Sequence, residues 1–157
     1  FNIKMKKIFI YLCFFSLFGC AGYEPLFSSK NLSFYIDSIE NFDNNKITKK
    51  ISSNLNVNKS KVNGKRGFVL KIASDEINKI TSKDAKGNPL TFEIILNIEV
   101  KVFNSSSGLL LSTFKLNKNF NYNNQINKFN LSLYKKGILE NMISKISKDI
   151  VIKLQSL

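Results

Sequence analysis

The sequence predicts an α+β fold, a two-layer sandwich in which two helices pack on one face of a mostly antiparallel four-stranded sheet. Apolar and polar residues alternate along residues 92–102, as in a strand with one buried face. Apolar residues recur every three or four positions along residues 131–154, as in an amphipathic helix. Shorter segments with one or the other period complete the order β-α-β-β-β-α.

The first strand and helix are predicted from a short apolar run and a repeat of four. Residues 34–39 (FYIDSI) are strand-like, and residues 43–45 (DNN) offer side chains that cap a helix N-terminus. Ile47, Ile51 and Leu55 then fall on one face of a helix of about three turns.

Three strands and two turns follow a polar, glycine-containing loop. In the central strand the even-numbered apolar residues point one way and the odd-numbered, mostly polar residues point the other, which indicates an antiparallel strand with one solvated face. Ser105–Gly108 predicts a hairpin turn. The loop is predicted at 58–67, the strands at 68–73, 90–103 and 110–122, and the first turn at 86–89.

The last helix is predicted to have about 25 residues, with lysines opposite its apolar stripe. Gly137 lies inside it and costs about 1 kcal/mol of helix propensity. This glycine indicates either a close contact between helix and sheet or a position without a structural role.

The second face of the sheet has no predicted covering element. It either faces water or receives a partner, and it combines apolar with basic residues. The apolar residues expected on or near it are Ile95, Phe103, Leu109 and Leu111, and the lysines are Lys71, Lys101 and Lys115. Lysine ammonium groups act as point charges towards phosphate, so we expect these three to contact the phosphates of a glycolipid.

The N-terminus predicts a lipoprotein signal peptide over residues 1–19, with the translation start at Met5. Two lysines are followed by an apolar run too short for the ~20 residues that span a bilayer. Leu17, Phe18 and Gly19 then precede Cys20, as in the recognition sequence for cleavage and lipid attachment. We expect Cys20 to carry a diacylglycerol and an N-acyl chain, residues 20–31 to form the tether, and residues 32–157 to form one domain. The alternative is an uncleaved anchor helix.

Composition limits the chemistry. The net charge is +13, with 24 Lys and Arg against 11 Asp and Glu, and there is no histidine. This charge indicates either an anionic partner or the codon bias of an AT-rich genome, and an exported chain is not expected to bind nucleic acid. The acidic residues are scattered and no phosphate-binding glycine loop is present. We therefore expect no enzyme, no metal and no cofactor besides the acyl chains.

Three segments resemble the LptE family of lipopolysaccharide-assembly lipoproteins. They are the start CAGYEPLF, the segment IENFDNNKITKKISSNL, and the C-terminal segment with Tyr122, Phe129 and the helical stripe from Leu131 to Leu154. The chain departs from the family pattern at Ala21 and Glu24.

The resemblance implies a lipid-anchored protein on the periplasmic face of the outer membrane. There it would form the plug of an LptD-like β-barrel and assist barrel assembly and lipopolysaccharide transport. The alternatives are a stand-alone envelope lipoprotein that binds an anionic lipid, or an auxiliary subunit of an ABC transporter.

Overall fold

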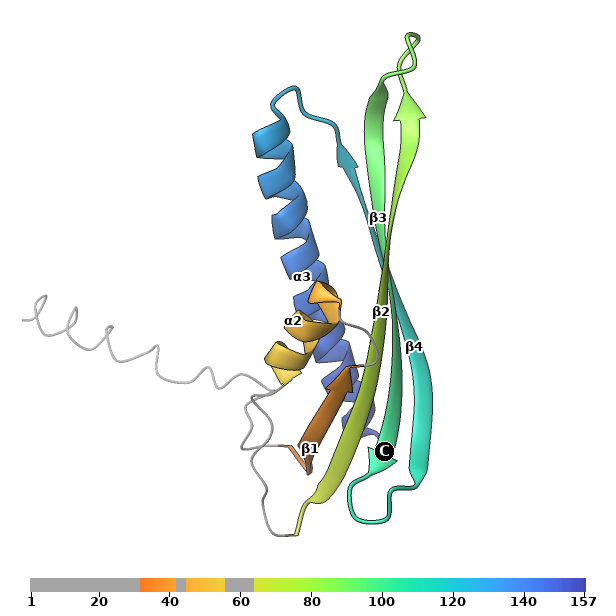
Figure 1. Cartoon of the computed structure of the whole chain (residues 1–157), viewed down its shortest axis with the longest axis vertical. Coiled ribbons are helices and arrows are strands. Elements are labelled where there is room, and N and C mark those ends of the chain that lie inside the picture. Colours follow the sequence, from red (N-terminus) through yellow and green to blue (C-terminus); the bar gives the residue numbers. More distant parts are fainter. Residues whose placement is uncertain (1–31, 42–44, 56–63) are drawn as a thin grey trace, which may run out of the picture. The chain divides into compact units, whose positions relative to one another are not determined.

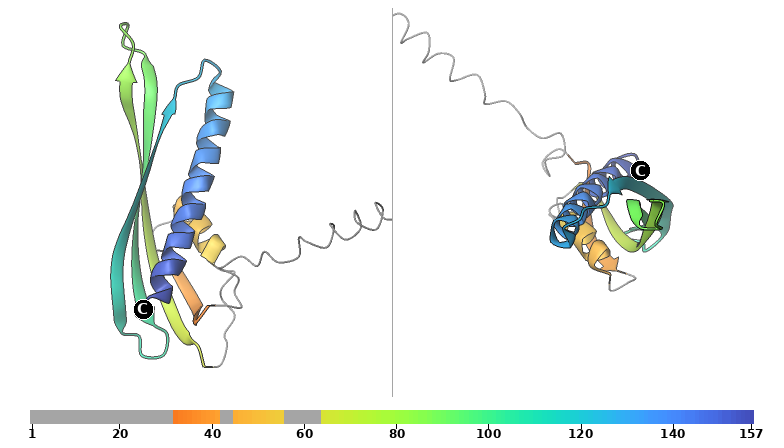
Figure 2. Two further views of the ribbon diagram at one scale, coloured as in Figure 1. Left: turned by 180° about the vertical axis from the view of Figure 1, so that it is seen from behind. Right: turned by 90° about the horizontal axis from the view of Figure 1, so that it is seen from above.

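The computed structural model describes residues 32–41, 45–55 and 64–157, and it confirms the predicted α+β order. Within these residues, two helices lie on one side of a four-stranded sheet (Figures 1 and 2). The elements are β1 (Phe34–Asn41), α2 (Lys46–Leu55), β2 (Arg66–Lys83), β3 (Pro89–Asn104), β4 (Leu110–Asn123) and α3 (Lys128–Gln155).

The strands follow one another across the sheet in the order β1-β2-β3-β4. The two hairpins β2–β3 and β3–β4 are antiparallel, whereas β1 runs parallel to β2. Parallel neighbours need a crossover connection, and the chain between β1 and β2 contains α2. Because β1 pairs only as far as Ile72, the rest of β2 has a single neighbour, β3.

The strand β2 is much longer than the sequence predicted. We expected residues 68–73, and the strand begins at Arg66, inside the predicted loop, and continues to Lys83 through a polar segment. Its pairing with β3 extends from Phe68 opposite Asn104 to Lys83 opposite Pro89. Backbone hydrogen bonds to β3, whose residues alternate clearly, therefore extend β2 through a segment whose own side chains do not predict a strand.

The core lies between the helices and the even-numbered side chains of β3. Leu96, Val100 and Val102 are fully buried, as are Ile51 of α2 and Ile146 of α3. Burying one such aliphatic side chain stabilises the fold by about 1.5–3 kcal/mol relative to leaving it in water. The predicted apolar stripes of strand and helices thus meet in one core cluster.

Asparagine side chains cap both helices. Asn45 Oδ1 accepts a hydrogen bond from Ile47 N at 3.0 Å. The N-terminal cap predicted within residues 43–45 is therefore Asn45. Asn127 Oδ1 accepts from Phe129 N and Asn130 N, so α3 begins before the predicted Leu131. Each cap satisfies backbone donors that have no partner inside the helix.

A hydroxyl pair joins α2 to the sheet. Thr48 is 0% exposed, and its Oγ1 lies 2.6 Å from Ser74 Oγ. Ser74 follows the last buried residue of β2, Ile72, on the helix-facing side. This bond satisfies a polar side chain that would otherwise be costly to bury.

Two glycines in the described part of the chain have opposite surroundings. A β-carbon at Gly67 would collide with Ser105 and with the ring of Tyr35, because the hairpin end of β3 and the strand β1 both approach this position. A β-carbon at Gly137 would have no atom within 4 Å. Of the two explanations for Gly137, a close contact between helix and sheet is therefore wrong.

The N-terminal half of α3 is tied to β2 by an ion pair. Lys135 Nζ lies 3.0 Å from Glu76 Oε1, and Asn78 Nδ2 donates to the same carboxylate at 2.8 Å. Partial burial alone raises the pKa of Glu76. The hydrogen bonds from Asn78 and Lys135 and the charge of Lys135 together outweigh it, so the net pKa lies below its usual 4.5.

We expect Gly67→Ala to lower the free energy of unfolding by about 1–3 kcal/mol, because Ser105 and Tyr35 must move to admit the methyl group. The matched substitution Gly137→Ala is expected to raise it by up to about 1 kcal/mol through helix propensity alone. Urea denaturation of both variants measures these changes, and equal effects would contradict the difference in surroundings.

Glu76→Gln is expected to destabilise the protein at pH 7 by about 0.5–1 kcal/mol, the value of a partly exposed ion pair. A carboxyl group with a lowered folded-state pKa stabilises the fold above its unfolded pKa, and this contribution is lost as pH falls through the folded value. The difference between wild type and variant should therefore shrink between pH 5 and pH 3 in urea titrations. A difference that stays constant with pH would show that the carboxylate charge contributes nothing.

Candidate functional site

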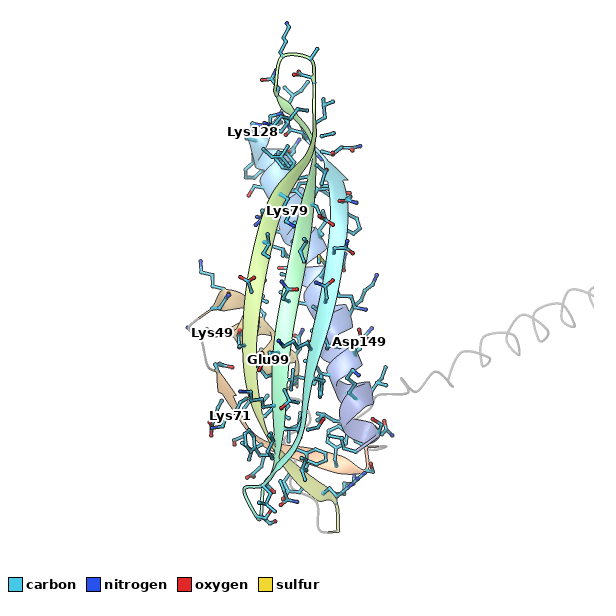
Figure 3. All side chains as sticks on the ribbon, turned by 90° about the vertical axis from the view of Figure 1, so that its right-hand side faces the viewer. Lys49, Lys71, Lys79, Glu99, Lys128 and Asp149 are labelled. Carbon is cyan, nitrogen blue, oxygen red and sulfur yellow. The ribbon has the colours of Figure 1, made fainter. Side chains whose placement is uncertain are left out.

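The open face of the sheet is the surface formed by outward-pointing side chains of β2, β3 and β4. In Figure 3 these strands lie in front of α3, and none of the described elements lies in front of them. Strand geometry places the odd-numbered residues of β3 here, because the even-numbered ones from Ile94 to Val102 are buried beneath the helices. Over this part of the strand and its flanks the odd-numbered residues are Glu93, Ile95, Asn97, Glu99, Lys101 and Phe103.

The structure brings the three predicted lysines together. Lys71 of β2 is the register partner of Lys101 of β3, and Lys115 of β4 is the partner of Glu99. All three therefore lie on adjacent strands of the open face, as the alternation of the strands predicted.

Two glutamates lie among these lysines. Glu99 lies 3.7 Å from Lys101 Nζ and 3.8 Å from Lys115 Nζ. Glu40, from the end of β1, lies 2.9 Å from Lys71 Nζ. Three ammonium groups thus face two ion-paired carboxylates, and the carboxylate of Asp75 lines the same surface beside Glu99 and Lys115. The surface is therefore an ion-pair network whose charges largely balance.

Apolar residues accompany this network. The ammonium group of Lys71 lies 5.3 Å from the centre of the Phe103 ring, within the range of a cation–π contact. Ile95 lies on the same face, between its register partners Ile77 and Asn119. Leu109 and Leu111 are exposed at the β3–β4 hairpin end. The open face therefore has both charged and apolar character.

Two shallow depressions lie on this face around Glu99. The smaller has a volume of about 230 Å³ and is lined by Lys71, Ala73, Glu99 and Lys101. The larger, of about 540 Å³, extends past Lys115 and Asn117 towards β4. A phosphate that approached the lysines would compete with the Glu99 carboxylate, so this arrangement favours an anion whose several charges replace it.

The sequence analysis found the lysines but missed their acidic partners. Glu99 and Lys115 belong to neighbouring strands, and only the register of the β3–β4 hairpin makes them opposite residues. The hairpin turn at residues 105–108 was the one available signal, because turn length fixes register. Leu17, Phe18, Gly19 and Cys20, with the predicted signal peptide and tether, lie outside the described residues.

The described residues contain no group of three or more His, Cys, Asp or Glu side chains able to hold a metal ion. Within the same part of the chain, neither helix combines the length and hydropathy needed to cross a membrane.

Several solved bacterial lipoprotein structures have a similar fold. A rare lipoprotein B from Shewanella oneidensis has 18% sequence identity and a TM-score of 0.59, covering 77% of this chain and 94% of that one. An uncharacterized lipoprotein B from Nitrosomonas europaea has 12% identity and a TM-score of 0.58, covering 86% and 91%. A minor lipoprotein from Acinetobacter baumannii has 14% identity and a TM-score of 0.54, covering 80% and 93%.

The TM-scores and coverages show a shared fold that extends over nearly the whole of the other proteins. Neither the scan of protein-family models nor the search of curated proteins produced a match. The topology of one sheet with two helices on one side is therefore common to this chain and to proteins named as lipoproteins.

We expect Glu99→Gln to raise the affinity of the open face for pyrophosphate by up to about fivefold, the equivalent of a loosely held, partly exposed ion pair. In the wild type this carboxylate forms ion pairs with Lys101 and Lys115, which compete with a bound phosphate. Chemical-shift titration of the neighbouring backbone amides measures the change. Glu93→Gln is the matched control, because that carboxylate accepts a hydrogen bond from Asn119 at 2.8 Å and forms no ion pair with the three lysines. An equal gain in the control would contradict a specific role of Glu99.

Proposed function

We propose that this protein is an LptE-like lipoprotein of the outer membrane, which partners an LptD-like β-barrel in the transport of lipopolysaccharide to the cell surface. The observation that supports the proposal is that a lipoprotein-type signal ending in Cys20 precedes a domain with the fold of several bacterial lipoproteins. The resemblance of three sequence segments to the LptE family supplies the finer assignment.

In this proposal the acyl chains on Cys20 hold the protein at the periplasmic face of the outer membrane. Residues 20–31 would connect the lipid to the folded domain, which begins at Leu32. The protein acts by binding and positioning other molecules, and it catalyses no reaction.

The open face is the proposed contact surface for the barrel. Its strands expose Ile95 and Phe103 beside charged side chains, and interfaces between proteins commonly combine apolar cores with polar rims. The ion-pair network around Glu99 gives such a contact a defined charge pattern, which favours one partner over others.

Lys71, Lys101 and Lys115 are the proposed phosphate contacts for lipopolysaccharide. They lie on one face within adjoining depressions, so a glycolipid with more than one phosphate can meet several of them together. Each such contact with an exposed lysine is weak alone, and binding would depend on the number of phosphates.

We expect affinity purification of the tagged chain in mild detergent to recover a large outer-membrane β-barrel, and mass spectrometry to find an acylated Cys20 at the N-terminus. Ile95→Asp should abolish recovery of the barrel, because it places a charge in the middle of the proposed contact surface. Ile152→Asp is the matched control, since Ile152 is 49% exposed on α3.

Recovery from the inner membrane with transporter subunits, without a barrel, would instead identify the chain as an auxiliary transporter protein. An unmodified Cys20 would contradict the lipoprotein assignment itself. Thermal unfolding of both aspartate variants establishes that they remain folded.

A further inference from the structure

A second surface lies on the helix-facing side of the sheet, in a groove between β4 and α3. The groove has a volume of about 680 Å³, within the usual range of small-molecule sites. Its lining residues are Phe120 from β4 and Leu133, Tyr134, Gly137, Ile138, Asn141, Met142 and Lys145 from α3. We refer to this set as the β4–α3 groove.

The groove exists because α3 does not follow β4 evenly. The Lys135–Glu76 ion pair ties the N-terminal half of α3 to β2, which lies beyond β3 from β4. Near the C-terminal end of α3, Lys153 Nζ lies 5.4 Å from the centre of the Phe114 ring of β4. Two further contacts join α3 to β4, the edge-to-face pair of Tyr134 and Tyr122 at 6.3 Å and the ion pair of Asp149 and Lys118 at 2.9 Å. Phe120 lies between these two contacts along β4.

The absence of a side chain at Gly137 leaves the space between the two contacts open. Leu133, Gly137, Asn141 and Lys145 follow one another at intervals of four and so form one stripe along the helix. A β-carbon at Gly137 would have open space around it. The stripe from Leu133 to Lys145 extends over ~18 Å of helix at 1.5 Å per residue.

The walls are apolar and remain in contact with water. Phe120 is 43%, Leu133 53% and Tyr134 45% exposed, whereas Ile138 and Met142 beneath them are buried. A cluster of partly exposed aromatic and aliphatic side chains over a buried apolar floor favours a ligand that supplies hydrocarbon.

One end of the groove is cationic. Lys145 lines it, and none of the eight lining residues is acidic. The two acidic residues nearest along the helix are already paired, Asp149 with Lys118 and Glu140 with Lys50. Among the described residues no carboxylate lies within ion-pair distance of Lys145. The groove is thus apolar along most of its length and positive at one end.

We propose that the β4–α3 groove binds a free anionic amphiphile, with its alkyl chain along Phe120, Leu133 and Gly137 and its anionic head group on Lys145. The charge at Lys145 distinguishes this ligand from the acyl chains expected on Cys20, whose thioether and amide links carry no negative charge. The proposal does not depend on the proposed function, because the groove lies on the other side of the sheet from the barrel contact surface.

The test uses the full chain isolated from membranes and placed in phosphatidylcholine nanodiscs. The probe is dodecyl phosphate carrying a photoreactive diazirine, and the second probe has the same chain on an uncharged maltoside. We expect mass spectrometry to find adducts on the segment 133–145 and on the β4 segment around Phe120. Gly137→Leu fills the groove and should reduce these adducts about tenfold, the equivalent of about two excluded methylene groups.

Lys145→Gln should reduce adducts of the phosphate probe about two- to fivefold and leave those of the maltoside probe unchanged. Lys148→Gln is the matched control, because Lys148 is exposed on the same helix and does not line the groove. Lys145→Arg should restore the adducts. This comparison keeps the test decisive if Gly137→Leu does not fold.

Adducts spread evenly along α3, adducts unchanged by both groove variants, or equal effects of Lys145→Gln and Lys148→Gln would each overturn the proposal. An absence of adducts would overturn it as well, including the case in which a co-purified protein covers the groove. If affinity purification recovers no barrel while these adducts form as expected, the proposed function alone is contradicted.

Discussion

The alternation along β3 is the constraint on which the rest of the structure depends. Ile94, Leu96 and Val100 are 0% exposed on its helix-facing side, and no described element covers its other side. Because successive side chains of a strand point to opposite faces, a shift of one residue would reverse both surfaces. Both hairpins share β3, so its register also fixes which residues of β2 and β4 face the helices and which face outward.

That register explains why the open face carries a charge network. Lys101 and Glu99 have the same parity along β3, and pairing places Lys71 and Lys115 beside them on the flanking strands. The network is therefore a consequence of strand register rather than of any local motif. Its mixture of charges keeps an exposed three-stranded surface hydrated, while Ile95 and Phe103 remain partly accessible.

The sequence predicted those parts of the fold in which local pattern and tertiary contacts agree. The buried stripes of β3 and α3 are visible in the residue order, and Asn45 caps α2 as its position predicts. The polar half of β2 was missed, because only the backbone ladder to β3 makes it a strand. Gly137 was ambiguous for a related reason: whether a missing side chain marks a contact or a gap depends on the position of a neighbouring strand.

The two layers also differ in how completely they cover each other, and this difference produces the groove. β1 and α2 lie beside the lower half of the sheet in Figure 1, so α3 alone covers the upper half. One helix cannot cover three strands, and the ion pair between Lys135 and Glu76 holds this part of α3 close to β2. The apolar side of β4 at Phe120 is left partly uncovered as a result. A fold built from one sheet and two unequal helices thus has two unlike surfaces, a charged one on the open face and an apolar one beneath α3.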